Sequence, residues 1–331
     1  MPEYLRNKAI SIPTNFTFIC SDELTEKVYD YYTKFEELGI VLGLSASFDG
    51  KYMEENRPHI RDLDLPITIV RDDAYYDKCF AFVRKIKGGF HPMIYSRGIE
   101  NWKKNFLWFQ EQFKKHDIPW DCLYLLHVRN EEWNNKQIQE LGNFIEWLWE
   151  WLWDKVDHNP ERFMEQVSNN RCFNILTQQF TQCGRGLTCS IQNNLVVRVS
   201  DLAVYPCHRL GYNDLHYGYF VEDDEQLLRF VNKNIELHMA VSTIHKEALP
   251  MCSQCPINKL CIGPCLGACY ESNNNMFAPI PSVCAISHML GVASIKGLKK
   301  IGMYRHILEY VMPDFRTQIL YLEEEVNLNV E

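Results

Sequence analysis

Apolar residues follow two different periods along the first half of the chain. Short runs of consecutive or alternating apolar residues predict strands, and longer segments with an apolar residue every three or four positions predict amphipathic helices. The two kinds of segment alternate, with strands expected at 9–19, 40–47, 65–71, 90–95 and 122–128 and helices at 22–38, 74–87, 102–116 and 134–157. Strands separated by helices of this length pair in parallel through crossover connections. The pattern therefore predicts an α/β fold with about five units of an open or closed (β/α) barrel.

The first strand of this series lies close to the start of the given sequence. Parallel strands are usually covered on both faces, so a series that opens in this way leaves an unpaired parallel edge. We expect either a partial barrel or preceding strands that come from another segment. The helix and strand rhythm stops between 159 and 170, which predicts two domains, 1–165 and 166–331. The second domain is expected to be irregular and rich in cysteine, with a small hairpin and helices.

The composition fits a folded protein with a sizeable core. The 331 residues are 46% hydrophobic and 13% aromatic, which argues against disorder. The formal net charge is -9, and no long basic stripe is present. Because phosphate binding needs clustered Lys and Arg, nucleic acid is not expected as a partner. A peptide, protein or small-molecule substrate fits better.

Two features predict a cytoplasmic protein without a membrane span. Met1 is followed by Pro2 and Glu3 rather than by the basic and apolar segments of a secretory signal. The most apolar window, 144–153, carries two glutamates and is far shorter than the roughly 20 apolar residues that a membrane helix needs. Its tryptophans at alternate positions are interpreted as residues of a bulky amphipathic helix packed on a sheet rather than as an aromatic platform for nucleotides.

The thirteen cysteines are unevenly distributed along the chain. A disulfide framework is not expected in a cytoplasmic protein, because that compartment keeps thiols reduced. Four cysteines are scattered singly and are interpreted as small buried apolar residues: Cys20, Cys79, Cys122 and Cys172. The other nine lie between Cys183 and Cys284, so we expect the chemistry of the protein in its second half.

The clustered cysteines follow a close spacing. Cys252, Cys255, Cys261 and Cys265 form CxxCx5CxxxC, preceded by Cys183, Cys189 and Cys207 and followed by Cys269 and Cys284. Thiolates are soft ligands for iron–sulfur clusters and zinc, and short spacings let their sulfurs converge at small entropic cost. The spacing predicts two four-cysteine metal sites and leaves the choice between zinc and clusters open. The apolar block 195–205 is expected to form a hairpin that delivers Cys207.

This cysteine order, with the run YPCHR around Cys207, resembles the SPASM pattern of radical S-adenosylmethionine (SAM) enzymes, which include sulfatase-maturating enzymes and peptide maturases. In that family, two interleaved ligand sets bind two auxiliary 4Fe-4S clusters. The resemblance implies Cys183, Cys189, Cys207 and Cys265 as ligands of the first cluster, and Cys252, Cys255, Cys261 and Cys284 as ligands of the second. Cys269 falls outside the pattern and is interpreted as a core thiol, with a role as an alternative ligand left open. The barrel-like first half favours clusters over zinc.

The first half resembles the SAM-binding part of the same family. The run SASFDG from Ser45 to Gly50 ends the second predicted strand, and the family has an SxDG-like strand end there that contacts SAM. The resemblance implies Ser47 and Asp49 as SAM contacts and Arg57 as the partner of the SAM carboxylate, with Arg61 as a rival. Ligands usually lie at the carboxyl ends of barrel strands. Taken alone, these residues also fit a strand that ends in a polar turn with solvated arginines.

The catalytic motif of the family does not occur in the given sequence. Radical SAM enzymes bind their SAM-cleaving cluster with CxxxCxxC, and no such triplet is present. The chain is therefore expected to be incomplete for SAM cleavage, as a fragment, as half of a split gene whose partner chain supplies the first strands, or as a degenerate paralogue. Completed, it is expected to abstract hydrogen from a peptide or protein side chain and to pass electrons to the auxiliary clusters. The alternative is a noncatalytic module that binds a peptide or partner and carries structural clusters or zinc.

His208 is a candidate catalytic residue. It follows Cys207, at the position where sulfatase-maturating enzymes typically have an aspartate that acts as a base. This departure argues against sulfatase maturation. A histidine can take up a proton near neutral pH, although a histidine beside a cluster ligand is more often a hydrogen-bonding neighbour.

Overall fold

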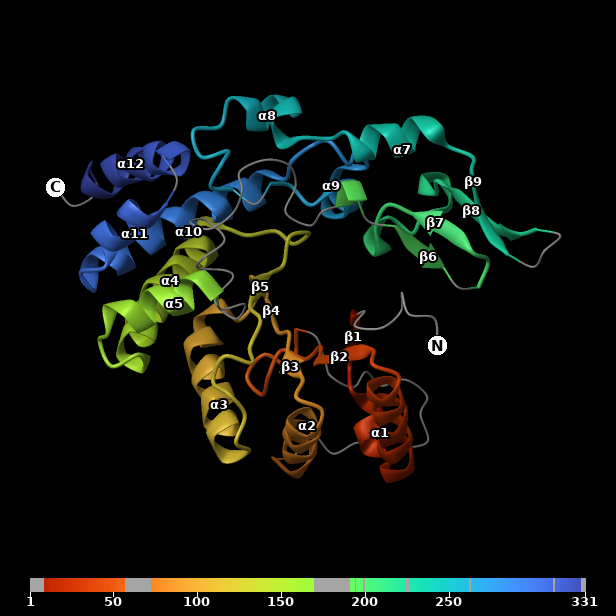
Figure 1. Ribbon diagram of the computed structural model, residues 1–331. Coiled ribbons are helices and arrows are strands. Elements are labelled where there is room, and N and C mark those ends of the chain that lie inside the picture. The colour runs from red at the N-terminus through yellow and green to blue at the C-terminus, as the bar shows by residue number, and fades with distance from the viewer. Residues whose placement is uncertain are drawn as a thin grey trace. The chain divides into compact units, whose positions relative to one another are not determined.

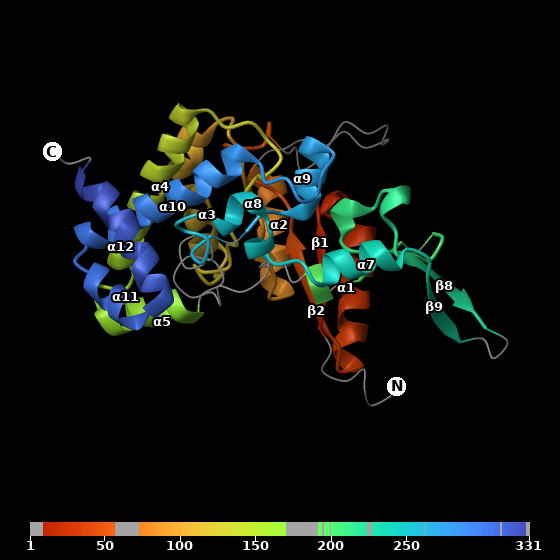
Figure 2. The same ribbon diagram turned by 90° about the horizontal axis from the view of Figure 1, so that it is seen from above.

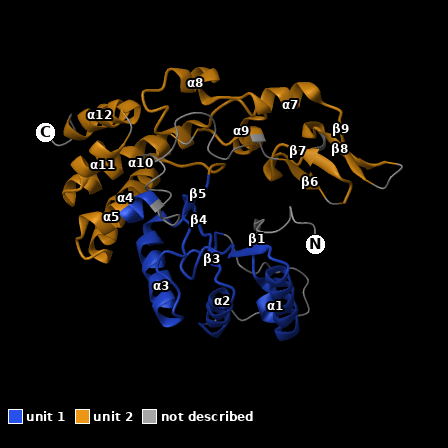
Figure 3. Ribbon diagram, in the orientation of Figure 1, with its two compact units in different colours: residues 1–128, 165–175 blue, residues 129–164, 176–331 orange. Residues whose placement is uncertain are grey.

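The computed structural model describes residues 9–56, 73–169, 191–193, 195–198, 200–223, 227–261, 263–311 and 313–328. The chain forms two compact units (Figure 3), Met1–Val128 with Glu165–Ile175 and Arg129–Met164 with Leu176–Glu331. The sequence predicts a domain boundary near residue 165. The two units are defined by contacts and do not test that boundary, so it stays a prediction.

The first unit repeats strand and helix, as the sequence pattern predicts. Its elements are β1 (Ala9–Thr14), α1 (Asp22–Glu37), β2 (Val41–Ala46), α2 (Asp73–Lys85), β3 (Gly89–Phe90), β4 (Met93–Ile94), α3 (Trp102–Lys115) and β5 (Leu126–His127). β1, β2 and β3 pair in parallel, β4 pairs in parallel with β5, and a parallel bridge joins Phe90 to Leu123. Figure 1 shows α1, α2 and α3 on one side of the strands. The α/β class is confirmed, and over the described residues the strands form small sheets without closing into a barrel.

Several strands are shorter than the sequence pattern predicts, for local reasons. β1 ends at Thr14 rather than near residue 19, because Phe16 adopts a left-handed conformation with φ 58° that an extended strand does not allow. The predicted strand 90–95 is divided into β3 and β4 by Pro92, which has no N–H to give to a ladder. The predicted strand 65–71 lies outside the described residues.

β2 is buried on one face only. Leu42, Leu44 and Ala46 are buried, whereas Val41 on the opposite face is 60% exposed. In the described part of the chain, β1 pairs with β2 and with no second neighbour. A strand inside a closed barrel is covered on both faces, so the exposed face of β2 differs from that arrangement over the described residues. The open parallel edge stays a prediction.

An aromatic cluster between the strands and helices fixes the end of β2. Phe48, just beyond β2, is fully buried, and its ring centroid lies 5.4 Å from that of Phe90 and 5.7 Å from that of Phe109. The rings of Phe80 and Phe90 are 4.5 Å apart. Burial of so many large rings holds the turn after β2 in one position.

In the second unit, two long helices pack closely. α4 (Asn135–Lys155) lies against α10 (Pro281–Lys300), and α11 (Tyr304–Tyr310) and α12 (Pro313–Leu328) pack on α10. A Cβ atom on Gly297 would lie 3.0 Å from Cβ of Trp149, so this glycine lets the fully buried indole approach the α10 backbone. The interpretation of Trp149 as a packing residue is confirmed, but α4 packs on the helix α10 rather than on a sheet as expected. α5 (Pro160–Asn169) crosses the boundary between the units.

The second unit also holds a four-stranded antiparallel sheet, in the order β6 (Val196–Arg198), β7 (Ala203–Tyr205), β8 (Gly218–Glu222) and β9 (Leu228–Asn232). Figure 2 shows the β8–β9 hairpin extending beyond the rest of this sheet. The predicted hairpin before Cys207 is confirmed, because β6 pairs with β7 and β7 ends two residues before this cysteine. Among the described residues, no helix is both long and apolar enough to cross a membrane.

Candidate metal centre

The clustered cysteines lie on short elements joined by tight turns. α8 (Pro250–Ser253) carries Cys252, α9 (Leu266–Asn273) begins directly after Cys265, and the first turn of α10 carries Cys284. Pro250 starts α8 with its fixed φ, and the backbone N–H of Cys252 donates to Leu249 O at 2.9 Å. The N–H of Cys255 then donates to Cys252 O at 3.2 Å.

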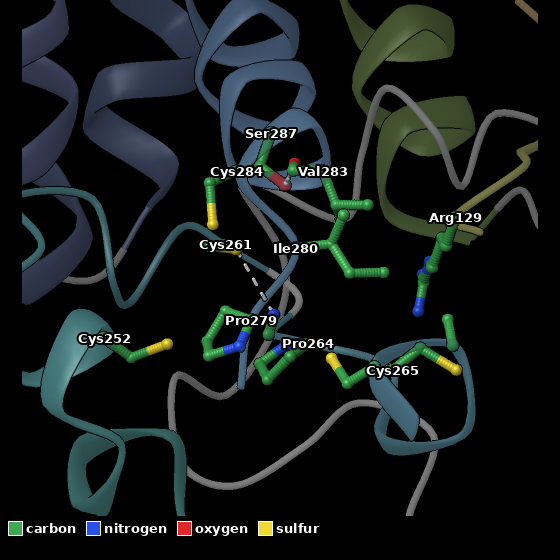
Figure 4. Close-up of a pocket in the computed structure, with 13 residues that line it drawn as sticks. Arg129, Cys252, Cys261, Pro264, Cys265, Pro279, Ile280, Val283, Cys284 and Ser287 are labelled. Atoms are coloured by element: carbon green, nitrogen blue, oxygen red, sulfur yellow. Dashed lines mark hydrogen bonds between the residues drawn. The ribbon is translucent and has the colours of Figure 1, made fainter. Parts of the chain in front are cut away.

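The four thiols assigned to the second cluster lie close to one another. The pKa of Cys252 is raised to about 11, first by burial and then by the neighbouring thiols of Cys261, Cys284 and Cys255. The pKa of Cys284 is raised by desolvation and then by Cys261 and Cys255. Figure 4 shows the sulfur of Cys284 pointing toward Cys261, with Cys252 directed into the same space. The structure therefore places Cys252, Cys261 and Cys284 at one pocket, with Cys255 near enough for its charge to act on Cys252 and Cys284.

These residues fit a metal group bound by thiolates. Cys252, Cys261 and Cys284 line one pocket, together with Cys265, Cys269 and the apolar side chains of Pro264, Ile280 and Val283, whereas Cys255 is not among its lining residues. Within the described ranges, no three His, Cys, Asp or Glu side chains already stand in a metal-binding arrangement. Thiolates repel one another unless a cation lies between them, and a bound metal deprotonates its thiol ligands. The donor set suits both an iron–sulfur cluster and zinc.

Two of the four cysteines assigned to the first cluster are described, and one arginine contacts both. The backbone N–H of Arg209 donates to Cys207 Sγ at 3.3 Å, and its guanidinium forms a hydrogen bond with the side chain of Cys265. The guanidinium also pairs with Glu271 at 2.7 Å. A Cβ atom on Gly267 would lie 2.6 Å from Arg209 Cβ, so the glycine makes room for this side chain. Cys183 and Cys189 lie outside the described residues.

Cys269 is a buried thiol beside both ligand sets. It is 1% exposed, and its pKa is raised to about 12, with burial as the largest cause. Cys265 of the first set contributes to this rise, as do Cys284 and Cys252 of the second. Its sulfur accepts a hydrogen bond from the backbone of Ile280. The interpretation of Cys269 as a core thiol agrees with this burial.

His208 lies at the surface. It begins the short 3-10 helix His208–Leu210 directly after Cys207, and its side chain is exposed. A proton carried by this ring can therefore exchange with solvent. Its assignment as a catalytic base stays a prediction.

The residues assigned to SAM binding lie in the first unit, at the carboxyl ends of its strands. Ser47 follows β2, and its N–H donates to Thr14 O at 2.8 Å. Asp49 is fully buried, and its Oδ1 accepts the N–H of Met93 at 2.7 Å. Asp49 thus connects the turn after β2 to β4. Arg57 and Arg61 lie outside the described residues.

Asn105 is a buried polar residue that the sequence pattern does not single out. Its Nδ2 donates to Asp49 O at 2.7 Å, and its Oδ1 accepts the N–H of Tyr52 at 3.2 Å. These bonds hold both sides of Gly50, whose φ of 101° requires glycine. The sequence feature that could have identified Asn105 is the position of an asparagine on the apolar face of the predicted helix 102–116.

No family model matches the chain, and no curated protein matches it. The resemblance to radical SAM enzymes therefore depends on the cysteine order and on the residues described above.

Proposed function

We propose that this chain is the C-terminal portion of a radical SAM protein of the SPASM type, which holds two auxiliary 4Fe-4S clusters and takes part in peptide or protein side-chain modification. The observation that carries the proposal is that Cys252, Cys261 and Cys284 line one pocket, with Cys255 as an electrostatic neighbour of Cys252 and Cys284. Three of these thiols come from the CxxCx5C segment, and the fourth comes from α10, 23 residues after Cys261 by the printed numbering. The family pattern assigns this set to a single cluster.

Each unit has its own part in the proposal. The second unit holds the clusters, with Cys183, Cys189, Cys207 and Cys265 as ligands of the first one. When bound, such clusters accept single electrons. To SAM binding, the first unit contributes Ser47, which follows β2 at a strand end where ligands of parallel folds usually lie, and Arg57, which lies outside the described residues. The CxxxCxxC segment is supplied from outside the given sequence, and the open edge of β1 is the place where its strands would pair.

One observation favours the alternative function. Asp49 is buried, and it is hydrogen-bonded to the first unit's own backbone, which suits a structural turn as well as a SAM site. In this alternative the chain is a noncatalytic module that binds a peptide or a partner protein, and its cysteines hold structural clusters or zinc.

An anaerobic reductive titration separates these functions. With dithionite as reductant and electron paramagnetic resonance as readout, we expect about two electrons to enter each chain, one for each cluster. Zinc has no redox chemistry, so a zinc-bound chain takes up none. Bound zinc without any reducible species would contradict the proposed function and support the alternative.

A further inference from the structure

Lys246 is a buried cation beside the second cysteine set. It begins the 3-10 helix Lys246–Ala248 and is 2% exposed. Its Nζ donates to the backbone oxygen of Cys261 at 2.6 Å. Over the described part of the chain, Lys246 forms no ion pair with a carboxylate. A carbonyl oxygen supplies a hydrogen bond to the ammonium group, but it supplies no negative charge.

The groups that can offset this charge are mainly thiols. Burial lowers the pKa of Lys246, and the group that opposes this most strongly is Cys261. The exposed Glu247 comes next, followed by Cys252 and Cys255. Lys246 thus contacts the backbone of Cys261 directly, and Cys252 and Cys255 are near enough for their charges to act on its ammonium group.

A buried ammonium group is unfavourable unless a negative charge lies nearby. Neutral thiols do not supply that charge. Four thiolates around a bound metal do supply a net negative charge. Their total negative charge exceeds the positive charge of a 4Fe-4S core or of a zinc ion. The position of Lys246 therefore fits the metal-loaded protein better than the metal-free one.

We propose that Lys246 is the counter-ion of the second four-cysteine site, where its ammonium group offsets the negative charge of the bound metal and thiolates. This inference rests on the proposed function, since it requires a metal group in that site. With a 4Fe-4S cluster bound, Lys246 also stabilises the reduced state, because reduction adds one further negative charge. Lys246 is thus a positioning residue that acts on the cluster through its charge.

The test compares Lys246→Met, which removes the charge at similar length, with Lys246→Arg, which keeps it. In the redox titration, we expect Lys246→Met to lower the ratio of reduced to oxidised second cluster about tenfold at a fixed potential. For a one-electron couple, this equals a decrease of about 59 mV in the reduction potential. Only one of the two transitions is expected to move. Lys246→Arg is expected to stay near the wild-type potential.

A second readout separates charge from structure. As a counter-ion, Lys246 stabilises the loaded protein and destabilises the metal-free one. Lys246→Met is therefore expected to lower the thermal midpoint of the loaded protein and to raise that of the metal-free protein. A residue needed only for its hydrogen bond to Cys261 would lower both midpoints on removal.

The outcomes for the two proposals are distinct. If the wild-type protein binds its metal but Lys246→Met leaves the reduction potential unchanged, the counter-ion role is overturned and the proposed function stands. The same holds if Lys246→Met lowers the thermal midpoints of both the loaded and the metal-free protein. A Lys246→Met chain that fails to fold without metal would also overturn it. If zinc occupies the site, the opposite shifts of the two midpoints still support the counter-ion, while the cluster assignment fails. A wild-type chain that binds no metal at all overturns both proposals.

Discussion

Replacing Cys252 and Cys284 together by alanine is expected to halve the iron and sulfide content of the anaerobically purified protein, from about eight of each per chain to about four. The two cysteines come from α8 and α10 and interact electrostatically in one pocket. Removing both leaves too few thiolates for the second cluster. The first cluster uses different ligands and is expected to remain. Iron and acid-labile sulfide assays measure the change directly.

A matched control is Cys20→Ala with Cys122→Ala. These two thiols are also partly buried, but they lie in the first unit and outside both ligand sets. The control is expected to keep the full iron content. The packing of α10 on α4 through Gly297 and Trp149 does not involve Cys284, so circular dichroism should show a folded variant. Equal iron loss in variant and control would contradict the assignment of ligands.

Removing the metal is expected to loosen the cysteine-rich segment 246–284 selectively, with amide hydrogen exchange there faster by about a hundredfold or more. The structure of this segment gives the reason. α8 spans four residues and α9 eight, and isolated helices of such length are not stable in water. In the segment between α8 and α9, Ile257, Leu260 and Pro264 are the buried apolar side chains among the described residues. The bound metal therefore supplies much of the order of this segment.

Hydrogen exchange with mass spectrometry provides internal controls for this prediction. α3 in the first unit is held by buried Trp102, Phe106 and Phe109, and its exchange is expected to stay the same. The second half of α10 is expected to stay protected by its packing on α4. A uniform increase over the whole chain, or none in 246–284, would contradict a metal site located there.

The βα order of the first unit was predictable because each element carries its own period of apolar residues. β2, α2 and α3 follow the pattern closely. The strand ends were not predictable from that period. Phe16 breaks β1 through its backbone conformation, and Pro92 divides a run that is apolar on both sides. Such interruptions depend on single residues, which a periodic signal does not register.

The candidate site was predictable only in part. The cysteine spacing indicated metal ligands, but the grouping of Cys284 with Cys252 came from the family resemblance, because chain spacing does not say where α10 lies. Arg209 and Lys246 were missed, since one basic residue has the same sequence signal whether it is solvated or buried beside thiols. Asp49 shows the same limit. A polar residue after a strand can contact a ligand or bond to its own backbone, and the sequence does not distinguish the two.

The central claim is that this chain carries two 4Fe-4S clusters, and the iron, sulfide and zinc content after strictly anaerobic purification tests it most directly. We predict about eight irons and eight sulfides per chain, with little zinc. Stoichiometric zinc with little sulfide would contradict the claim.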